Sequence, residues 1–156
     1  MSILKEFGGI QMYVKTRTNV YHTSYHLVWV TKYRTPIFTT NSDREELKTE
    51  LELIAHRNSI SILEMEVVDD HVHLVISFPP SLSISNAVKV LKGASARTWF
   101  KSHPETKDKL WGGSLWSGSY FVSTVGNVSK EIVLDYVQEQ LTEYNSGRPR
   151  RDSSHG

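Results

Sequence analysis

Residues 71–78, HVHLVISF, restrict the fold more than any other segment of the chain. Successive side chains of a β-strand point to opposite faces of a sheet, so this segment predicts a strand with one entirely apolar face. Two prolines at 79–80 end it, and two aspartates at 69–70 predict a tight turn from a preceding strand. The apolar face is expected to pack against helices, which leaves His71 and His73 together on the other face.

Strand-like and helix-like segments alternate along the rest of the chain. Composition predicts strands at 21–34, 60–68 and 115–126, and helical spacing of apolar residues predicts helices at 44–57, 84–101 and 130–144. The order is strand, helix, strand, strand, helix, strand, helix. This order predicts an α+β fold: a ferredoxin-like or RRM-like antiparallel sheet with helices on one face, plus a C-terminal helix.

The length of 156 residues, 38% of them hydrophobic, suits a single domain spanning 1–156 with its core at about 21–144. Residues 1–20 are expected to be an irregular extension and 145–156 a disordered tail. The chain has no cysteine, which excludes disulfides, thiolate metal sites and a cysteine nucleophile. No segment resembles a signal peptide or a membrane span, so we expect a soluble, cytoplasmic protein without a membrane partner.

Two small sets of side chains could carry chemistry. His71 and His73 share a strand face and offer two imidazole lone pairs to a divalent metal, although a polar strand edge would look the same. Tyr136 and Gln140 share a helix face, where a Gln amide oxygen could be a further ligand. An ordinary amphipathic helix would also expose these two residues, so the residues alone leave both interpretations open.

Five ordered blocks of sequence are similar to the single-tyrosine HUH transposases of small bacterial and archaeal insertion sequences, which act on single-stranded DNA. The blocks are HLVWVTKYR at 26–34, DHVHLVISFPP at 70–80, SISNAVKVLKGASAR at 83–97, LWSGSYFVSTVG at 115–126 and YVQEQ at 136–140. The resemblance therefore covers most of the chain and includes both sets of candidate residues.

The resemblance implies a role for each of these residues. Tyr136 would be the catalytic nucleophile that forms a 5′-phosphotyrosine, and His71, His73 and Gln140 would bind Mg²⁺ or Mn²⁺. The partners would be single-stranded DNA hairpins at element ends and a second copy of the chain in a homodimer. The tyrosine helix could complete the site of either copy through a flexible joint at 126–129, although an ordinary strand-to-helix turn would have the same sequence there. The protein would be associated with the nucleoid of a prokaryote.

Basic and aromatic residues could contact the DNA, although charges on a helix are usually only its solvated face. The DNA-binding candidates are Lys32, Tyr33, Arg34, Lys89, Lys92 and Arg97, with Trp111 and Trp116 as possible stacking residues. His22 and His26 alternate on the first strand and could neighbour the site, although a structural role is expected for both. The aspartates at 69–70 could orient an imidazole or simply form the turn.

Three other functions compete with transposition. A domesticated HUH nuclease acting on chromosomal repeats would keep the same chemistry. A non-catalytic module that binds single-stranded nucleic acid could use the same sheet, but would leave Tyr136 and the histidine pair without a joint purpose. A two-histidine phosphoesterase is disfavoured, because the triplet at 71–73 lacks a hydroxyl residue.

Overall fold

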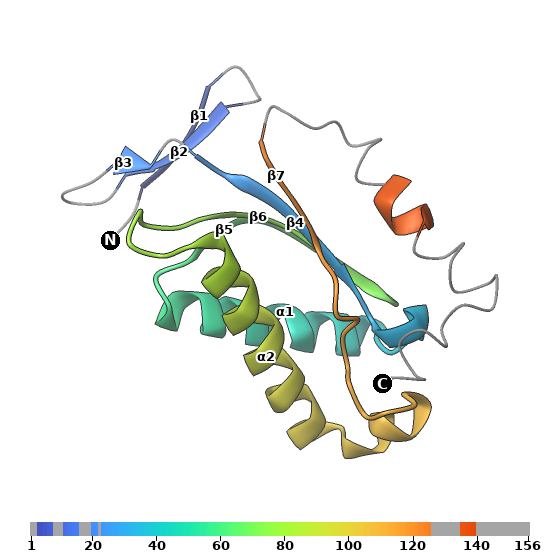
Figure 1. Ribbon diagram of the computed structural model, residues 1–156. Coiled ribbons are helices and arrows are strands. Elements are labelled where there is room, and N and C mark those ends of the chain that lie inside the picture. Colours follow the sequence, from blue (N-terminus) through green and yellow to red (C-terminus); the bar gives the residue numbers. More distant parts are fainter. Residues whose placement is uncertain (1–2, 8–10, 16–19, 22, 126–134, 140–156) are drawn as a thin grey trace.

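The computed structural model describes residues 3–7, 11–15, 20–21, 23–125 and 135–139. These residues form two antiparallel sheets (Figure 1). The smaller sheet has the order β1-β2-β3 and consists of β1 (Ile3–Phe7), β2 (Gln11–Lys15) and β3 (Val20–Tyr21). The larger sheet has the order β5-β6-β4-β7 and consists of β4 (Tyr25–Val30), β5 (Ser61–Val68), β6 (His71–Ser77) and β7 (Phe121–Thr124).

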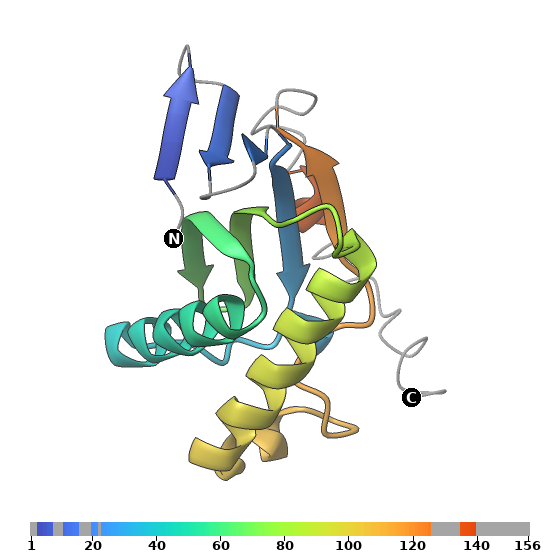
Figure 2. The same ribbon diagram turned by 90° about the vertical axis from the view of Figure 1, so that its left-hand side faces the viewer.

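Helices cover one face of the larger sheet, as Figures 1 and 2 show. They are α1 (Asn41–Arg57) and α2 (Ile84–Ser102), with short 3-10 turns η1 (Lys32–Arg34) and η2 (Pro104–Lys109) at the same end of the molecule. The first strand lies between the third and the fourth, and all neighbours are antiparallel. The predicted ferredoxin-like α+β fold is therefore confirmed.

Side-chain caps fix where the two long helices begin. The hydroxyl of Thr40 accepts a hydrogen bond from the backbone N–H of Asp43 at 3.0 Å, and that of Ser83 accepts one from Asn86 at 3.1 Å. Each bond satisfies an N–H that has no partner within the helix. Because Thr40 is the cap, α1 begins at Asn41, three residues before the predicted start at residue 44.

The main core lies between the larger sheet and the two helices. In β6 the apolar positions Val72, Leu74 and Ile76 are completely buried on the helical face, as the alternation predicts. The ring of Phe38 packs edge-on against Trp99 of α2, with centroids 4.9 Å apart. Large side chains buried against one another in this way supply most of the stabilisation of a domain of this size.

The structure corrects three expectations. The extension before residue 21 was expected to be irregular, but its described residues form the strands of the smaller sheet. The strands predicted at 21–34 and 115–126 are shorter than expected, because the first turns into η1 and the second begins only at Phe121. Trp116 is only 7% exposed and donates to the hydroxyl of Ser95 at 3.0 Å, so it is a core residue and not a stacking platform.

Two predicted segments lie outside the described residues: the joint at 126–129 and the tail at 145–156. The last helix is described only at 135–139. Within the described part of the chain, no helix is long and apolar enough to cross a membrane.

Candidate active site

The histidine pair lies on the sheet face that α1 and α2 leave uncovered. In β6, His71 and His73 are half-buried and alternate with the core residues of the opposite face. The antiparallel register sets Val28 of β4 on one side of His73 and Glu66 of β5 on the other. Directly paired residues share a face, so this row of three side chains lies together on the histidine face.

The helical residues 135–139 pack on this same face. Val137 is only 9% exposed and contacts Val28, and the ring of Tyr136 lies 5.5 Å from that of Phe121 in β7. Phe121 is paired with Val28, which in turn is paired with His73. Figure 1 shows the short helix across the sheet from α1 and α2. The structure thus brings Tyr136 and the histidine pair to one face, while Gln140 lies outside the described residues.

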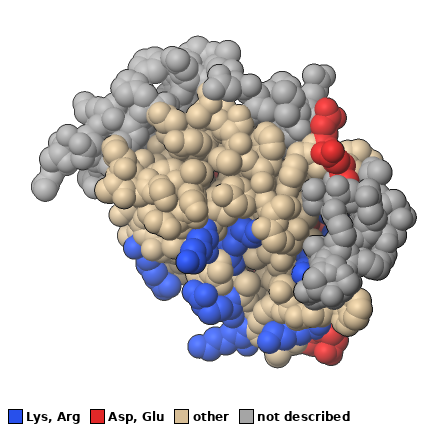
Figure 3. Space-filling model, viewed as in Figure 1, with Lys and Arg blue, Asp and Glu red and all other residues tan. Residues whose placement is uncertain are grey.

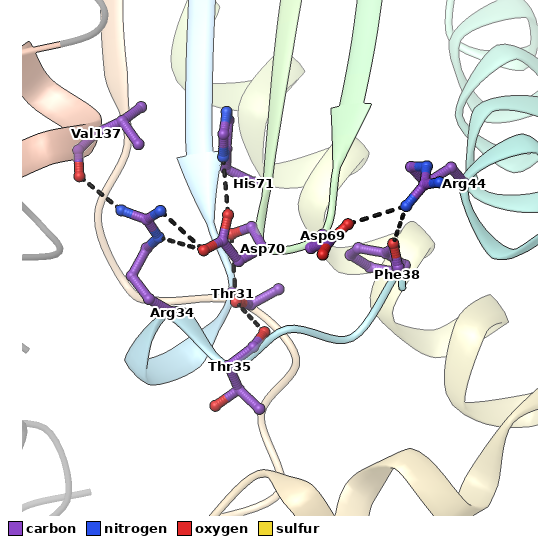
Figure 4. Close-up of polar contacts among 9 residues, drawn as sticks. All are labelled: Thr31, Arg34, Thr35, Phe38, Arg44, Asp69, Asp70, His71 and Val137. Atoms are coloured by element: carbon purple, nitrogen blue, oxygen red, sulfur yellow. Dashed lines mark hydrogen bonds and ion pairs between the residues drawn. The ribbon is translucent and has the colours of Figure 1, made fainter. Parts of the chain in front are cut away.

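Asp70 orients His71 (Figure 4). Its Oδ1 lies 2.9 Å from Nδ1 of His71, and an ionised carboxylate can only accept this bond, so the neutral form of this imidazole carries its proton on Nδ1 and its lone pair on Nε2. Burial alone would raise the pKa of Asp70, but the hydrogen bond from His71 and the positive charge of Arg34 outweigh burial and lower it. Such a carboxylate–histidine pair is the usual support of a metal-binding imidazole.

His26 lies beside His73, a position that the sequence allowed although it favoured a structural role for His26. Its Nδ1 lies 3.2 Å from Nε2 of His73, and the two rings stack with centroids 5.4 Å apart. Burial lowers the pKa of His73, and the adjacent His26 lowers it further; burial also lowers the pKa of His26. Both rings are therefore neutral at neutral pH, the form that can bind a metal. The sequence signal for this position was the two-residue spacing of His26 and Val28 in β4, which sets both side chains on the same face of the sheet.

The described residues supply only part of a metal site. Among them, no group of three or more His, Cys, Asp or Glu side chains is arranged to hold a metal ion. The two histidines at 71 and 73 can offer two nitrogen ligands, and an amide oxygen such as that of Gln140 would suit as a further ligand of a Mg²⁺ or Mn²⁺ ion.

A loop before β7 reaches the hydroxyl of Tyr136. The hydroxyl oxygens of Ser119 and Tyr136 are 3.3 Å apart. Lys92 of α2 holds this loop by donating from Nζ to the carbonyl oxygens of Ser117, at 2.8 Å, and Ser119, at 3.1 Å. Burial lowers the pKa of Lys92 to about 8. Neither serine was singled out from the sequence, because the contact joins segments distant along the chain.

Two of the six DNA-binding candidates make contacts within the chain. Arg34 is engaged with Asp70, and Lys92 with the 117–119 loop, so both make contacts within the chain. Lys32 and Tyr33 lie in η1, whereas Lys89 and Arg97 are exposed on α2.

Basic side chains gather in Figure 3 over the lower half of the molecule, the part of the view that α1 and α2 occupy. Most of them therefore lie over the helical layer, whereas Arg34 reaches the carbonyl oxygen of Val137. Trp111, at 70% exposed, remains available for stacking.

Comparisons with known proteins show that this chain belongs to a class of DNA-rearranging proteins. The family described as "Transposase IS200 like" matches residues 19–140. The ISDra2 transposase TnpA of Deinococcus radiodurans is 42% identical over 81% of this chain and 89% of its own length. The transposase of insertion sequence element IS200 from Salmonella typhimurium is 31% identical over 81% of this chain and 82% of its own.

A solved structure agrees as well. The crystal structure of a candidate transposase from Deinococcus radiodurans R1 superposes with a TM-score of 0.73 at 40% identity, covering 81% of this chain and 96% of that one. The chain belongs to the IS200-like transposase family, whose members are DNA-cleaving enzymes.

Proposed function

We propose that this transposase cleaves and rejoins single-stranded DNA at the ends of an insertion element, with Tyr136 as the nucleophile. The observation that carries the proposal is the docking of residues 135–139 on the histidine face through Val137 and Val28. Val28 is the strand neighbour of His73. A phenol beside a pair of metal-binding imidazoles is the combination that a covalent attack on a phosphate requires.

His71, His73 and Gln140 would hold the Mg²⁺ or Mn²⁺ ion. Asp70 supports this role of His71 by fixing its tautomer, and the lowered pKa of His73 supports it by keeping that ring neutral. The role of Gln140 rests on the family resemblance. When bound, the metal would polarise the scissile phosphate and offset negative charge that develops there.

The reaction stores the energy of the broken bond. The oxygen of Tyr136 forms a bond to the scissile phosphorus, and the bond from phosphorus to the 3′ oxygen breaks. The phenol loses one proton and the departing 3′ oxygen gains one, which leaves a 5′-phosphotyrosine and a free 3′-hydroxyl. A later attack by a 3′-hydroxyl on the phosphotyrosine reverses these steps and rejoins DNA without an external energy source.

The same proposal includes the DNA substrate, the oligomeric state and the domain boundaries. The DNA would be hairpins at the element ends, and the chain would act as a homodimer in the cytoplasm, on the nucleoid of a prokaryote. Residues 1–156 would form one transposase domain with its core at 21–144.

Covalent trapping tests this function directly. The full chain is incubated with labelled single-stranded element ends and Mg²⁺ or Mn²⁺, and the products are separated on a denaturing gel. We expect a protein–DNA adduct that chelator prevents and that Tyr136→Phe reduces at least about a thousand-fold, since this variant lacks the attacking oxygen.

Tyr120→Phe is the matched control, because Tyr120 is an exposed phenol close to Tyr136 in the chain. It should give the wild-type amount of adduct. An adduct that persists in Tyr136→Phe would overturn the nucleophile assignment. Binding of matched DNA without any adduct from the wild type would instead favour a non-catalytic binding module.

A further inference from the structure

Arg34 links the tyrosine helix to Asp70, the carboxylate that orients His71. Its side chain is only 10% exposed and makes three contacts to two acceptors: Nε lies 2.9 Å and Nη2 2.8 Å from Oδ2 of Asp70, and Nη1 donates to the carbonyl oxygen of Val137 at 2.7 Å. The other carboxylate oxygen of Asp70 accepts from His71. Figure 4 shows the resulting chain of contacts from the helix to the imidazole.

The backbone around Arg34 is held in an uncommon conformation. Tyr33 and Arg34 have φ values of 59° and 56°, a left-handed region that side chains other than glycine rarely adopt. The hydroxyl of Thr31 donates to the carbonyl of Thr35 at 2.7 Å, and the hydroxyl of Thr35 donates to that of Lys32 at 2.8 Å. Such strain persists only where surrounding contacts impose it, and it often marks a functional position.

The turn is also tied to Asp70 itself. The backbone N–H of Thr31 donates to the Asp70 carbonyl at 2.9 Å. Arg34 and its carboxylate partner are therefore fixed relative to each other before the helix is considered. The helical residues 135–139, by contrast, bury one apolar side chain, Val137, in a small cluster with Val28, Phe121 and Tyr136. The charge-assisted hydrogen bond from Arg34 adds to this attachment.

We propose that Arg34 is a positioning residue that docks the tyrosine helix on the histidine face, with Asp70 as its anchor. A guanidinium has donors on two edges of one rigid plane, so it can bind the carboxylate and the carbonyl at once. Asp70 then orients His71 with one oxygen and Arg34 with the other. The proposal rests on the proposed role of Tyr136, whereas the docking itself can be measured without any chemistry.

Hydrogen exchange on the metal-free full chain measures the docking. In Arg34→Ala, amides of residues 135–139 should exchange about ten- to a hundred-fold faster, which is the factor expected for losing one hydrogen bond to a charged group. Amides of α2 serve as the internal reference for global opening. Asp70→Asn should also speed exchange at 135–139, because Asp70 holds Arg34 in place. The effect should be smaller than that of Arg34→Ala, since the Asp70 side chain bonds Arg34 and His71 while the bond to Val137 comes from Arg34.

Arg44 provides a matched control. Its Nη1 lies 2.9 Å from Oδ1 of Asp69 and 2.9 Å from the carbonyl oxygen of Phe38, the same combination of carboxylate and main-chain acceptor. Arg44→Ala should leave exchange at 135–139 at the wild-type rate. Equal exchange at 135–139 in wild type and Arg34→Ala, or equal acceleration in Arg44→Ala, would overturn the proposal.

Arg34→Lys covers the case in which the alanine variant does not fold. The ammonium keeps the charge beside Asp70 but lacks the second edge, so exchange at 135–139 should still rise about ten-fold. Wild-type exchange in Arg34→Lys would contradict the proposal.

Added guanidinium, at concentrations too low to denature the protein, should restore both slow exchange at 135–139 and adduct formation in Arg34→Ala. It should not restore adduct formation in Tyr136→Phe. If Tyr136→Phe kept the adduct, the proposed function would fail while the exchange result stood.

Discussion

The two faces of the larger sheet are built for different tasks although they share every strand. In β6, Leu74 is completely buried under the helices, while its neighbour His73 lies half-buried on the other face. Among the described residues, the helical face belongs to a core cluster of twenty buried residues, whereas the cluster that docks the tyrosine helix has two, Val28 and Val137. In this part of the chain most apolar burial therefore lies on one face, which leaves the other face able to carry polar groups and the tyrosine helix.

Leu74→Ala should cause the largest loss of stability among single changes in β6. Truncating a fully buried leucine costs about 2–5 kcal/mol, because apolar contacts are lost and a cavity remains. Urea unfolding followed by circular dichroism measures the change. His73→Ala is the matched control on the opposite face and should cost less than about 1 kcal/mol while it abolishes adduct formation. Comparable destabilisation by both variants would show that His73 supports the fold.

Val28→Ala should weaken the docking cluster more than the fold. Removing about two buried methyl groups costs roughly 1–2 kcal/mol. Since Val28 contacts Val137, we expect faster hydrogen exchange at 135–139 in particular. Leu27→Ala, one residue away on the helical face, should lower global stability without this local effect. If Leu27→Ala selectively accelerated hydrogen exchange at 135–139, the two faces would be coupled through β4.

Glu50→Gln should have the smallest effect, and only on the helical side. Burial, together with the nearby carboxylate of Glu46, raises the pKa of Glu50 in α1 to about 7. The folded state then binds a proton more tightly than the unfolded state, whose pKa is near 4.5, so this group costs stability as pH rises from about 4.5 to 7.

Unfolding free energies measured between pH 5 and pH 8 test this expectation. Glu50→Gln should reduce the loss of stability over this range relative to wild type, because the amide does not ionise. Glu52→Gln changes an exposed neighbour on α1 and should leave the pH profile as it is. Identical profiles for wild type and Glu50→Gln would contradict the raised pKa.

The order of strands and helices could be predicted because each element carries its own periodicity. The alternation at 71–78 gave both the strand and the facing of its histidines. The smaller sheet was missed, although Gly8-Gly9 lies between two strand-length runs and is a recognised hairpin signal. Trp116 was misassigned because burial of an aromatic residue in a loop depends on what folds over it, here Ser95 of α2.

The site could be predicted only as far as local spacing and the family resemblance reach. Tyr136 and the histidine pair were singled out, and their common face follows from tertiary packing that no local pattern contains. The contact of Arg34 with Asp70 joins residues 36 positions apart, and that with Val137 spans 103. From the sequence Arg34 was therefore a candidate for DNA binding, since a basic residue at a strand end gives no indication of an internal partner.

The acceptor that Arg34 uses on the tyrosine helix is a main-chain carbonyl, and main-chain groups are the same in every copy of a protein. The contact does not depend on the side chain at position 137, beyond its apolar packing, or on which molecule supplies the helix. In a homodimer, a helix arriving from the second copy would present the same oxygen to the same guanidinium. Exchange of helices between subunits would thus preserve this contact and require no additional recognition residue.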